Sequence, residues 1–343
     1  MEDGAISVNS EEIDLQKFLK TCYELKPKTL FISELKWKYL MRSVIRGKHI
    51  MMTGPSGWGK TMTAKAVQSA LKRPSFSFNM GAMQDARSSL IGNVFFDKEK
   101  GTFFSESSFI KAISTENAVI LLDEMTRILP DAGNILMTVL DPIQGYVRLD
   151  ETVNSSIVNV AKGVTFIATS NIGVEYTFTR TLDRALKERF IIAEMDELTK
   201  EQESELIRMI YPRIKKQMAD SISTLSANTR NEIRSESPKL STSISTRMAL
   251  AMAGLISDGF SYTEASDISV MPFFSVEGGN TSERSYVKKL TQMYIYEEYN
   301  DDISEHVDEK VENVIPNGES QAGVVDDLFS DSDIQASNFL KKI

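Results

Sequence analysis

The sequence predicts an α/β protein, in which a parallel β-sheet carries helices on both faces and a smaller all-helical domain follows. Two observations lead to this prediction. Five short apolar runs alternate with segments of helical periodicity, which is typical of strands buried on both faces. After Thr199 the helical pattern continues without a convincing strand. With 343 residues, of which 41% are hydrophobic, the chain is long enough for two domains.

The elements follow in a clear order along the chain. Residues 1–28 are polar, and we expect a loose extension with one short helix at 11–25. Residues 29–195 form the predicted α/β domain, which opens with a core-facing helix at 33–46. Its five apolar runs are KHIMMT, SFSFNM, AVILLDE, VTFIATSN and RFIIAEM. Residues 196–296 form the predicted helical domain. Residues 297–343 hold 13 acidic residues and three lysines, and we expect them to be disordered.

Composition narrows the classes of protein. The acidic tail accounts for the net charge of −9, and the nearly neutral remainder argues against broad nucleic-acid binding, although a local basic patch stays open. No apolar run approaches the ~20 residues of a membrane span, and the start lacks a signal-peptide pattern. The single cysteine, Cys22, fits a reducing compartment, so we expect a cytoplasmic protein without membrane contact. With only His49 and His306 beside it, a Cys/His metal site is not expected.

The stretch GPSGWGKT lies between the first apolar run and a helical pattern, and it matches G-x-x-x-x-G-K-[ST], the P-loop. Polyphosphate needs converging backbone N–H groups without side chains in the way, which Gly54, Gly57 and Gly59 permit. The following helix adds N–H donors and a favourable dipole. Lys60 is expected to reach the β- and γ-phosphates and Thr61 to bind Mg²⁺. The predicted loop residues are Gly54, Pro55, Ser56, Gly57, Trp58, Gly59, Lys60, Thr61 and Met62.

Further polar residues follow the later strands. Asp123 is expected to hold Mg²⁺ and Glu124 to polarise the attacking water, although a strand can also end in solvated acids. Asn171, at the end of VTFIATSN, would orient water near the γ-phosphate; alone it is more typical of a turn. Arg184 and Arg189 precede the last strand and usually would cap carbonyls or face solvent. In an oligomer, one of them can act as an arginine finger on the neighbouring subunit's ATP.

These elements, in this order, resemble the AAA+ ATPases over roughly residues 30–295. Segments 80–113 and 140–163 are similar to the helix-2 insert and the following hairpin of the MoxR-type branch. Segment 243–265 resembles the lid helix that carries sensor 2, which would make Arg247 that residue rather than a solvated arginine. Together with segment 271–290, the lid most resembles CobS-type subunits, the ATPase partners of cobalt chelatases. Large tailed phages also encode such CobS-like proteins.

The resemblance implies a homo-oligomeric ring, commonly hexameric, that binds ATP and Mg²⁺ between subunits. The function it favours is an ATPase that remodels an unidentified protein partner. There are two alternatives, the motor subunit of a metal chelatase and a nucleic-acid-processing motor. The nearly neutral charge outside the acidic tail argues against the nucleic-acid motor. The pattern Ala-Leu-x-x-Arg-Phe favours Arg189 over Arg184 as the finger. In the tail, an apolar cluster at residues 324–329 predicts either partner docking or a solubilising segment.

Overall fold

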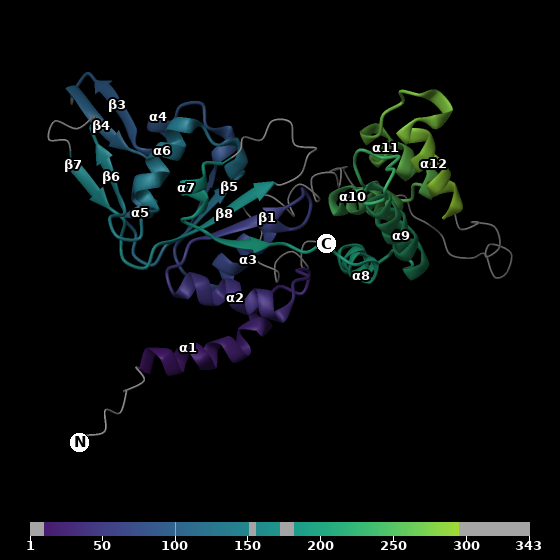
Figure 1. The fold of residues 1–343 in the computed structure, drawn as a ribbon, viewed down its shortest axis with the longest axis horizontal. Helices are drawn as coiled ribbons and strands as arrows, with labels where there is room; N and C mark the ends of the chain where they lie inside the picture. The colour runs from purple at the N-terminus through teal and green to yellow at the C-terminus, as the bar shows by residue number, and fades with distance from the viewer. Residues whose placement is uncertain (1–9, 100, 151–155, 172–181, 295–343) are drawn as a thin grey trace, which may run out of the picture. The chain divides into compact units, whose positions relative to one another are not determined.

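The computed structural model describes residues 10–99, 101–150, 156–171 and 182–294, with side chains from residue 15 onward. Their contacts divide them into two compact units, one that ends at Asp196 and one that begins at Glu197. Figure 1 traces the elements of both units. The prediction for the acidic tail, residues 297–343, lies outside the described residues. Within the described part of the chain, no helix is both long and apolar enough to cross a membrane.

The first unit is built on a five-stranded sheet with the strand order β2-β5-β8-β1-β9. Neighbouring strands pair in parallel throughout. The strands are β1 (Ile50–Gly54), β2 (Ser75–Asn79), β5 (Val119–Asp123), β8 (Thr165–Asn171) and β9 (Ile191–Glu194). Each of the five apolar runs forms one of these strands, so the predicted parallel α/β sheet is confirmed.

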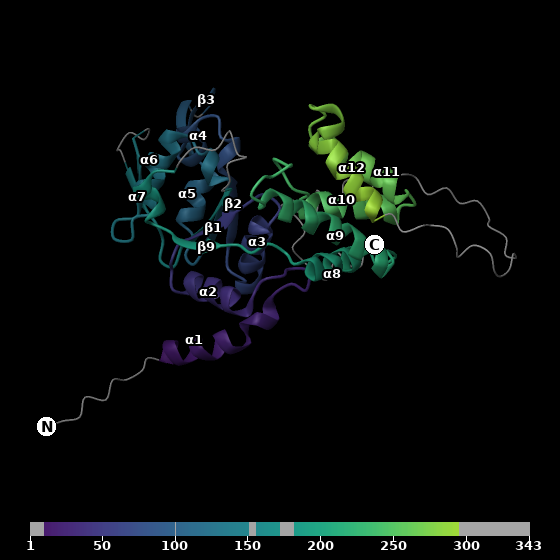
Figure 2. The ribbon, with the colours of Figure 1, turned by 45° about the vertical axis from the view of Figure 1, so that its right-hand side comes forward.

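Helices cover both faces of this sheet because successive strand side chains point in opposite directions. On one face, Ile50 and Met52 belong to a buried cluster with residues of α2 and α3. On the other face, Met51 belongs to a cluster with residues of α4, α5, α6 and α7. The helices are α2 (Glu34–Ile45), α3 (Lys60–Leu71), α4 (Ala86–Leu90), α5 (Ser108–Ile113), α6 (Pro130–Val139) and α7 (Arg184–Lys187). Figures 1 and 2 show these two groups on opposite sides of the strands.

The end of the N-terminal segment is packed more firmly than the loose extension that the sequence predicts. Helix α1 (Ser10–Thr21) and the 3₁₀ turn η1 (Cys22–Leu25) precede α2. Cys22 is fully buried, and its carbonyl accepts a hydrogen bond of 2.7 Å from the indole Nε1 of Trp37. A buried indole needs such an acceptor. Residues on the two sides of the predicted boundary at residue 28 therefore pack together in one buried cluster.

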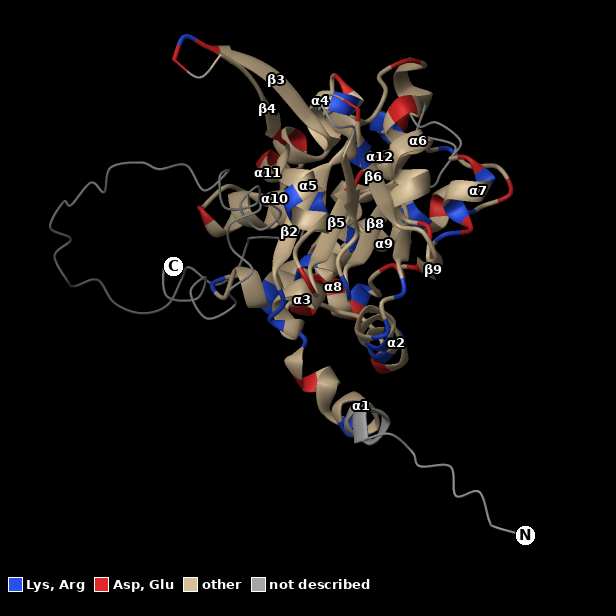
Figure 3. Ribbon diagram, turned by 90° about the vertical axis from the view of Figure 1, so that its left-hand side faces the viewer, with Lys and Arg blue, Asp and Glu red and all other residues tan. Residues whose placement is uncertain are grey.

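Two antiparallel hairpins interrupt the helices of the first unit. One consists of β3 (Gly92–Asp97) and β4 (Gly101–Glu106), and the other of β6 (Tyr146–Leu149) and β7 (Ser156–Asn159). They fall in the two segments that resemble the MoxR-type inserts. Figure 3 shows β3 and β4 extending outward to a tip that carries acidic and basic residues.

The described part of the second unit contains helices and no strand. Its α-helices are α8 (Lys200–Ile210), α9 (Lys216–Ile233), α10 (Thr246–Ser257), α11 (Tyr262–Ser269) and α12 (Glu283–Met293). Short 3₁₀ turns, η4 (Met271–Phe273) and η5 (Gly279–Thr281), lie between α11 and α12. Side-chain caps fix several helix starts, such as the capping box that Thr199 forms with Gln202 at the start of α8.

Candidate nucleotide-binding site

The polar residues predicted at the ends of the strands, Asp123, Glu124 and Asn171, lie at the carboxyl edge of the sheet. Strand register places Gly54 beside Asn171, and Asn79 beside Asp123. Parallel strands present their carboxyl ends at one edge, where ligands of open α/β sheets bind. The end of the P-loop strand and the acidic strand end therefore share an edge, with β8 between β1 and β5.

The P-loop connects β1 directly to α3. Gly57 and Gly59 have φ angles of 82° and 71°, which L-residues with a side chain rarely adopt. Gly59 caps α3 in the left-handed conformation, so the first N–H groups of the helix face the loop. A helix N-terminus behind a glycine turn is suited to bind phosphate oxygens.

Lys60 begins α3 and lies folded over the loop. Its Nζ donates hydrogen bonds of 2.8 Å to the Gly54 carbonyl and 2.6 Å to the Pro55 carbonyl. Only 7% of the residue is exposed. The ammonium group is thus held inside the loop, in the place where a P-loop lysine would meet phosphate. Trp58 is partly buried against the cluster that contains residues of α2 and α3, and its ring lies beside Gly54.

Asp123 is the centre of a hydrogen-bonded chain of hydroxyls. The Thr61 hydroxyl donates to its carboxylate at 3.1 Å, and the Thr169 hydroxyl donates to Oδ1. Thr169 Oγ1 also accepts a hydrogen bond of 3.1 Å from the backbone N–H of Glu124. These contacts hold together the two residues predicted to bind Mg²⁺, one from the P-loop helix and one from β5.

Glu124 directly follows β5 and starts the 3₁₀ turn η3 (Met125–Arg127) with a left-handed φ of 57°. Its Oε2 lies 3.4 Å from Nη1 of Arg127. The glutamate contacts Gly81, which belongs to the turn η2 (Met80–Ala82) after β2. The carboxylate thus leans toward β2.

The remaining predicted residues have different surroundings. Asn171 is the last residue of β8 and is half-buried. Arg189 donates from Nε to the Met137 carbonyl at 3.0 Å and from Nη1 to the Ala185 carbonyl at 2.7 Å. The Arg184 side chain is 92% exposed and pairs with Glu188 at 2.9 Å. Arg247 is an exposed residue of the first turn of α10 in the second unit.

Three residues of this edge were not predicted from the sequence. Thr169 joins Asp123 to the backbone of Glu124, while Gly81 and Arg127 contact the Glu124 side chain. A threonine inside VTFIATSN gives no local signal, because its role depends on strand register. The arginine three residues after Glu124 was a readable signal, since a tight turn brings positions i and i+3 together.

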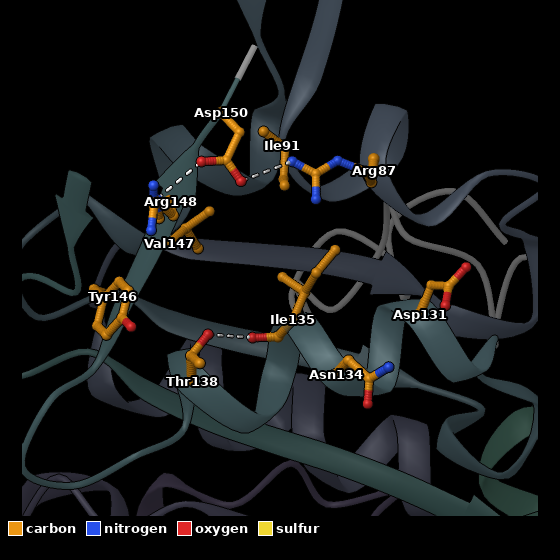
Figure 4. A pocket seen from close by; sticks show the side chains of 10 residues that line it. All are labelled: Arg87, Ile91, Asp131, Asn134, Ile135, Thr138, Tyr146, Val147, Arg148 and Asp150. Carbon is orange, nitrogen blue, oxygen red and sulfur yellow. Dashed lines mark hydrogen bonds and ion pairs between the residues drawn. The ribbon is translucent and has the colours of Figure 1, made fainter. Parts of the chain in front are cut away.

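A separate pocket of about 370 Å³ lies between α4, α6 and β6. Figure 4 shows Arg148 and Arg87 both directed at Asp150, with ion-pair distances of 2.9 and 3.8 Å, above Ile135. None of its lining residues belongs to the predicted nucleotide site. Two of its four charged side chains, Arg87 and Arg148, thus pair with a third, Asp150, and the fourth is Asp131.

The residues at the sheet edge fit Mg²⁺ and a polyphosphate chemically. A hydroxyl and a carboxylate are the hard oxygen ligands that Mg²⁺ prefers, and Thr61 and Asp123 already lie within hydrogen-bond distance of each other. The buried ammonium of Lys60 donates to two backbone carbonyls, and it can exchange these neutral partners for anionic oxygen.

Comparison with known proteins agrees with this geometry. Residues 49–190 match the family described as the AAA domain (dynein-related subfamily). The putative chaperone BssE of Thauera aromatica is 30% identical over 218 residues, which cover 63% of this chain and 72% of that protein. A mitochondrial Lon protease homolog of Dictyostelium discoideum is 29% identical over 180 residues, which cover 50% of this chain but only 18% of that protein.

Among solved structures, the RuvB Holliday junction branch migration motor of Thermotoga maritima is similar, with a TM-score of 0.44 and 17% identity. The match covers 78% of this chain and 72% of that one.

Proposed function

The chain belongs to the AAA family, dynein-related subfamily, and is an ATP hydrolase; on that premise we propose that an oligomeric ring of it uses Mg²⁺-dependent hydrolysis to remodel a protein partner. The single observation that carries the site is the chain of hydroxyl contacts from Thr61 through Asp123 to Thr169. These contacts link the P-loop helix to the acidic end of β5. Glu124, the proposed base, directly follows Asp123 in the chain.

Each residue of the edge has a distinct proposed role. Lys60 supplies positive charge to the β- and γ-phosphates, and Thr61 and Asp123 hold the metal ion. When bound, Mg²⁺ neutralises charge that develops on the phosphates. Glu124 accepts the proton of the attacking water, and Asn171 keeps that water oriented. Phosphoryl transfer needs little more than such positioning and charge stabilisation.

Two observations support a protein, rather than a nucleic acid, as the partner that is remodelled. One relative, which is matched over 72% of its length, is described as a putative chaperone. The β3–β4 hairpin exposes apolar side chains, of which Phe96 is 76% exposed and Val94 51% exposed. An exposed apolar hairpin on the nucleotide-binding unit suits contact with polypeptide better than contact with phosphate backbones.

Arg247 would complete the site as sensor 2, as the resemblance implies.

Trapping the ATP-bound state tests this proposal. Glu124→Gln keeps the site's shape but removes the base, so the variant should bind ATP and hydrolyse it ~10²–10⁴ times more slowly. Affinity purification with ATP, followed by mass spectrometry, should recover a protein that is absent when Lys60→Ala is the bait. That protein, when purified, should stimulate the wild-type ATPase.

The other outcomes favour the alternatives or contradict the proposal. Stimulation by DNA but not by the captured protein would favour a nucleic-acid motor. Capture of a chelatase subunit would favour the narrower chelatase function. If Glu124→Gln hydrolyses ATP at the wild-type rate, the assignment of the base is wrong.

A further inference from the structure

Helix α2 exposes a line of side chains that the nucleotide site does not use. Leu35 is 81% exposed and Tyr39 is 39% exposed, and Arg42 and Arg46 are also exposed. These four residues follow one another at intervals of four, three and four positions, so they share one face of the helix. The opposite face, which includes Trp37, is buried. We call the four exposed residues the α2 stripe.

The α2 stripe is apolar where the helix begins and basic where it ends. Glu34, the only acidic residue of α2, pairs with Lys38 at 2.5 Å near the start of the helix. At the other end, Nη1 of Arg73 donates a 3.4 Å hydrogen bond to the carbonyl of Val44, which brings the end of α3 to the last turn of α2. Lys72, beside Arg73, is exposed. Figure 3 shows basic positions along α2.

The mixture of side chains on the α2 stripe indicates what kind of ligand fits it. Basic residues alone at the end of a helix have an ordinary explanation, because they stabilise the helix dipole. They would also suit a phosphate backbone. A phosphate backbone, however, offers little to an exposed leucine and tyrosine on the same line. Apolar and basic side chains together favour a polypeptide whose own side chains are apolar and acidic.

The acidic tail contains a segment with this complementary composition. Segment 324–333, VVDDLFSDSD, has four apolar residues, four aspartates and no basic residue. It lies outside the described residues, and about 30 residues separate it from Tyr294, where the described part of the chain ends. An extended linker of that length spans ~100 Å, which is several times the radius of a domain of about 200 residues. Chain length therefore does not prevent the segment from reaching α2.

We propose that segment 324–333 docks on the α2 stripe of its own chain. Its apolar residues cover Leu35 and Tyr39, and its aspartates pair with Arg42 and Arg46. The tail thereby acts as an intramolecular ligand that shields the basic end of α2 from other anions. Tethering supplies an effective concentration in roughly the millimolar range, so contacts that are weak between separate molecules suffice here. This docking does not depend on the roles proposed above for the nucleotide site.

Photo-cross-linking in the full-length protein tests the docking. Ala336→Cys places a benzophenone label three residues beyond the segment, and Cys22 does not compete for the label because it is fully buried. Wild-type protein treated with the same reagent is the labelling control. Irradiation should join the label to a peptide from residues 34–46 of the same chain. Raising the salt from about 0.1 to about 1 M shortens the screening length from ~10 to ~3 Å and should lower the yield.

Charge reversal tests the pairing between the aspartates and the arginines. Arg42→Glu combined with Arg46→Glu should lower the cross-link yield about fivefold or more, because two exposed attractive pairs become repulsive. Adding Asp326→Lys and Asp327→Lys to this variant should restore the yield. Such a rescue requires that the two sets of residues meet.

Further variants separate docking from general disturbance of the protein. Lys288→Glu with Lys289→Glu reverses two exposed lysines of α12 and should leave the yield unchanged. Leu328→Ser with Phe329→Ser removes apolar side chains from the tail and should lower the yield while α2 keeps its sequence. This tail variant decides the matter if the α2 variants do not fold.

The results that contradict the docking are specific. A label that joins no peptide of α2, or that joins α2 equally in all variants, excludes it. A cross-link between two chains would assign the α2 stripe to the tail of a neighbouring copy and overturn docking within the chain. The proposal also fails if the tail does not cross-link and a fluorescent DNA duplex binds the wild type but not Arg42→Glu. The α2 stripe would then be a nucleic-acid surface.

Discussion

Two clusters of polar side chains, one in each unit, differ in the partners they use. At the sheet edge, Asp123 is met by the neutral hydroxyls of Thr61 and Thr169, and Lys60 by backbone carbonyls. In the helical unit, charges meet charges. Arg230, 6% exposed, lies 2.5 Å from fully buried Glu203 and 3.0 Å from Glu197.

The difference predicts what each cluster contributes. Neutral partners can be exchanged for a metal ion or a phosphate at small cost, so the sheet edge is suited to bind ligands. The partners of a buried Arg–Glu pair cannot be exchanged for a ligand at small cost, because removing one partner leaves an uncompensated buried charge. Substitutions at the edge should therefore abolish activity with little loss of stability, and substitutions in the helical cluster should do the reverse.

Lys60→Ala tests the edge with the largest expected effect. Removal of the point charge facing the β- and γ-phosphates should abolish ATP binding, and ATPase activity should fall to background. The thermal midpoint should change by no more than a few degrees, because the loop carbonyls of Gly54 and Pro55, which lose a hydrogen bond each, are neutral groups. Nucleotide titration and thermal unfolding of the same preparation check both halves. Wild-type affinity, or collapse of the fold, would contradict the comparison.

The arginine finger has the next largest expected effect. Arg189→Ala should lower turnover ~10³–10⁵-fold if Arg189 serves the neighbouring subunit. Within its own subunit, however, its hydrogen bonds tie the Met137 carbonyl to α7, so the variant should also lose stability. Arg184, in contrast, forms an exposed ion pair with Glu188.

Mixed rings separate the two roles of Arg189. Rings assembled from Arg189→Ala and Lys60→Ala subunits contain interfaces with an intact P-loop opposite an intact arginine, and they should recover activity. The same mixture with Arg184→Ala is the matched comparison. Recovery with Arg184→Ala alone would transfer the assignment to Arg184.

Much of this site could be predicted from the sequence, because phosphate binding imposes local requirements. The glycines, Lys60 and Thr61 are adjacent in the chain, and Asp123 and Glu124 end a recognisable apolar run. Thr169 could not be predicted, since its contact with Asp123 depends on the register of β5 against β8. The packing of the N-terminal segment was missed for a related reason: the Cys22 carbonyl meets its donor, Trp37, only after α2 folds.

Arg230→Ala tests the helical cluster. Loss of the guanidinium leaves Glu203 buried without its partner, which should cost about 3–5 kcal/mol of unfolding free energy. Replacing both residues with apolar ones, Arg230→Met with Glu203→Leu, should recover most of that loss. Denaturant unfolding measures both, and Arg208→Ala, an exposed arginine of α8, is the control. Equal losses in the single and double variants would mean that packing, rather than charge, holds these helices.

The smallest expected effect concerns pH, where the two units should respond with opposite signs. Burial, helped by the charge of Lys48, lowers the pKa of His49 to about 4 from 6.5. Its Nδ1 accepts a 3.3 Å hydrogen bond from the Phe166 N–H, and the rings of Phe166 and Phe190 lie beside it. Because the folded protein keeps this imidazole neutral, the contribution is complete above pH 6.5. It should fall by about 3 kcal/mol as the pH drops through 4.

In the helical unit the sign reverses, because burial raises the pKa of the Glu203 carboxyl. A raised pKa favours the folded state as the pH falls, so protonation there opposes the loss at His49. Unfolding free energies at pH 7, 5.5 and 4.5 should therefore decline less steeply in His49→Gln than in the wild type. The unfolding free energy of Glu203→Gln should decline more steeply than that of the wild type. Parallel pH dependence in all three proteins would show that neither group is held in the protonation state that its burial implies.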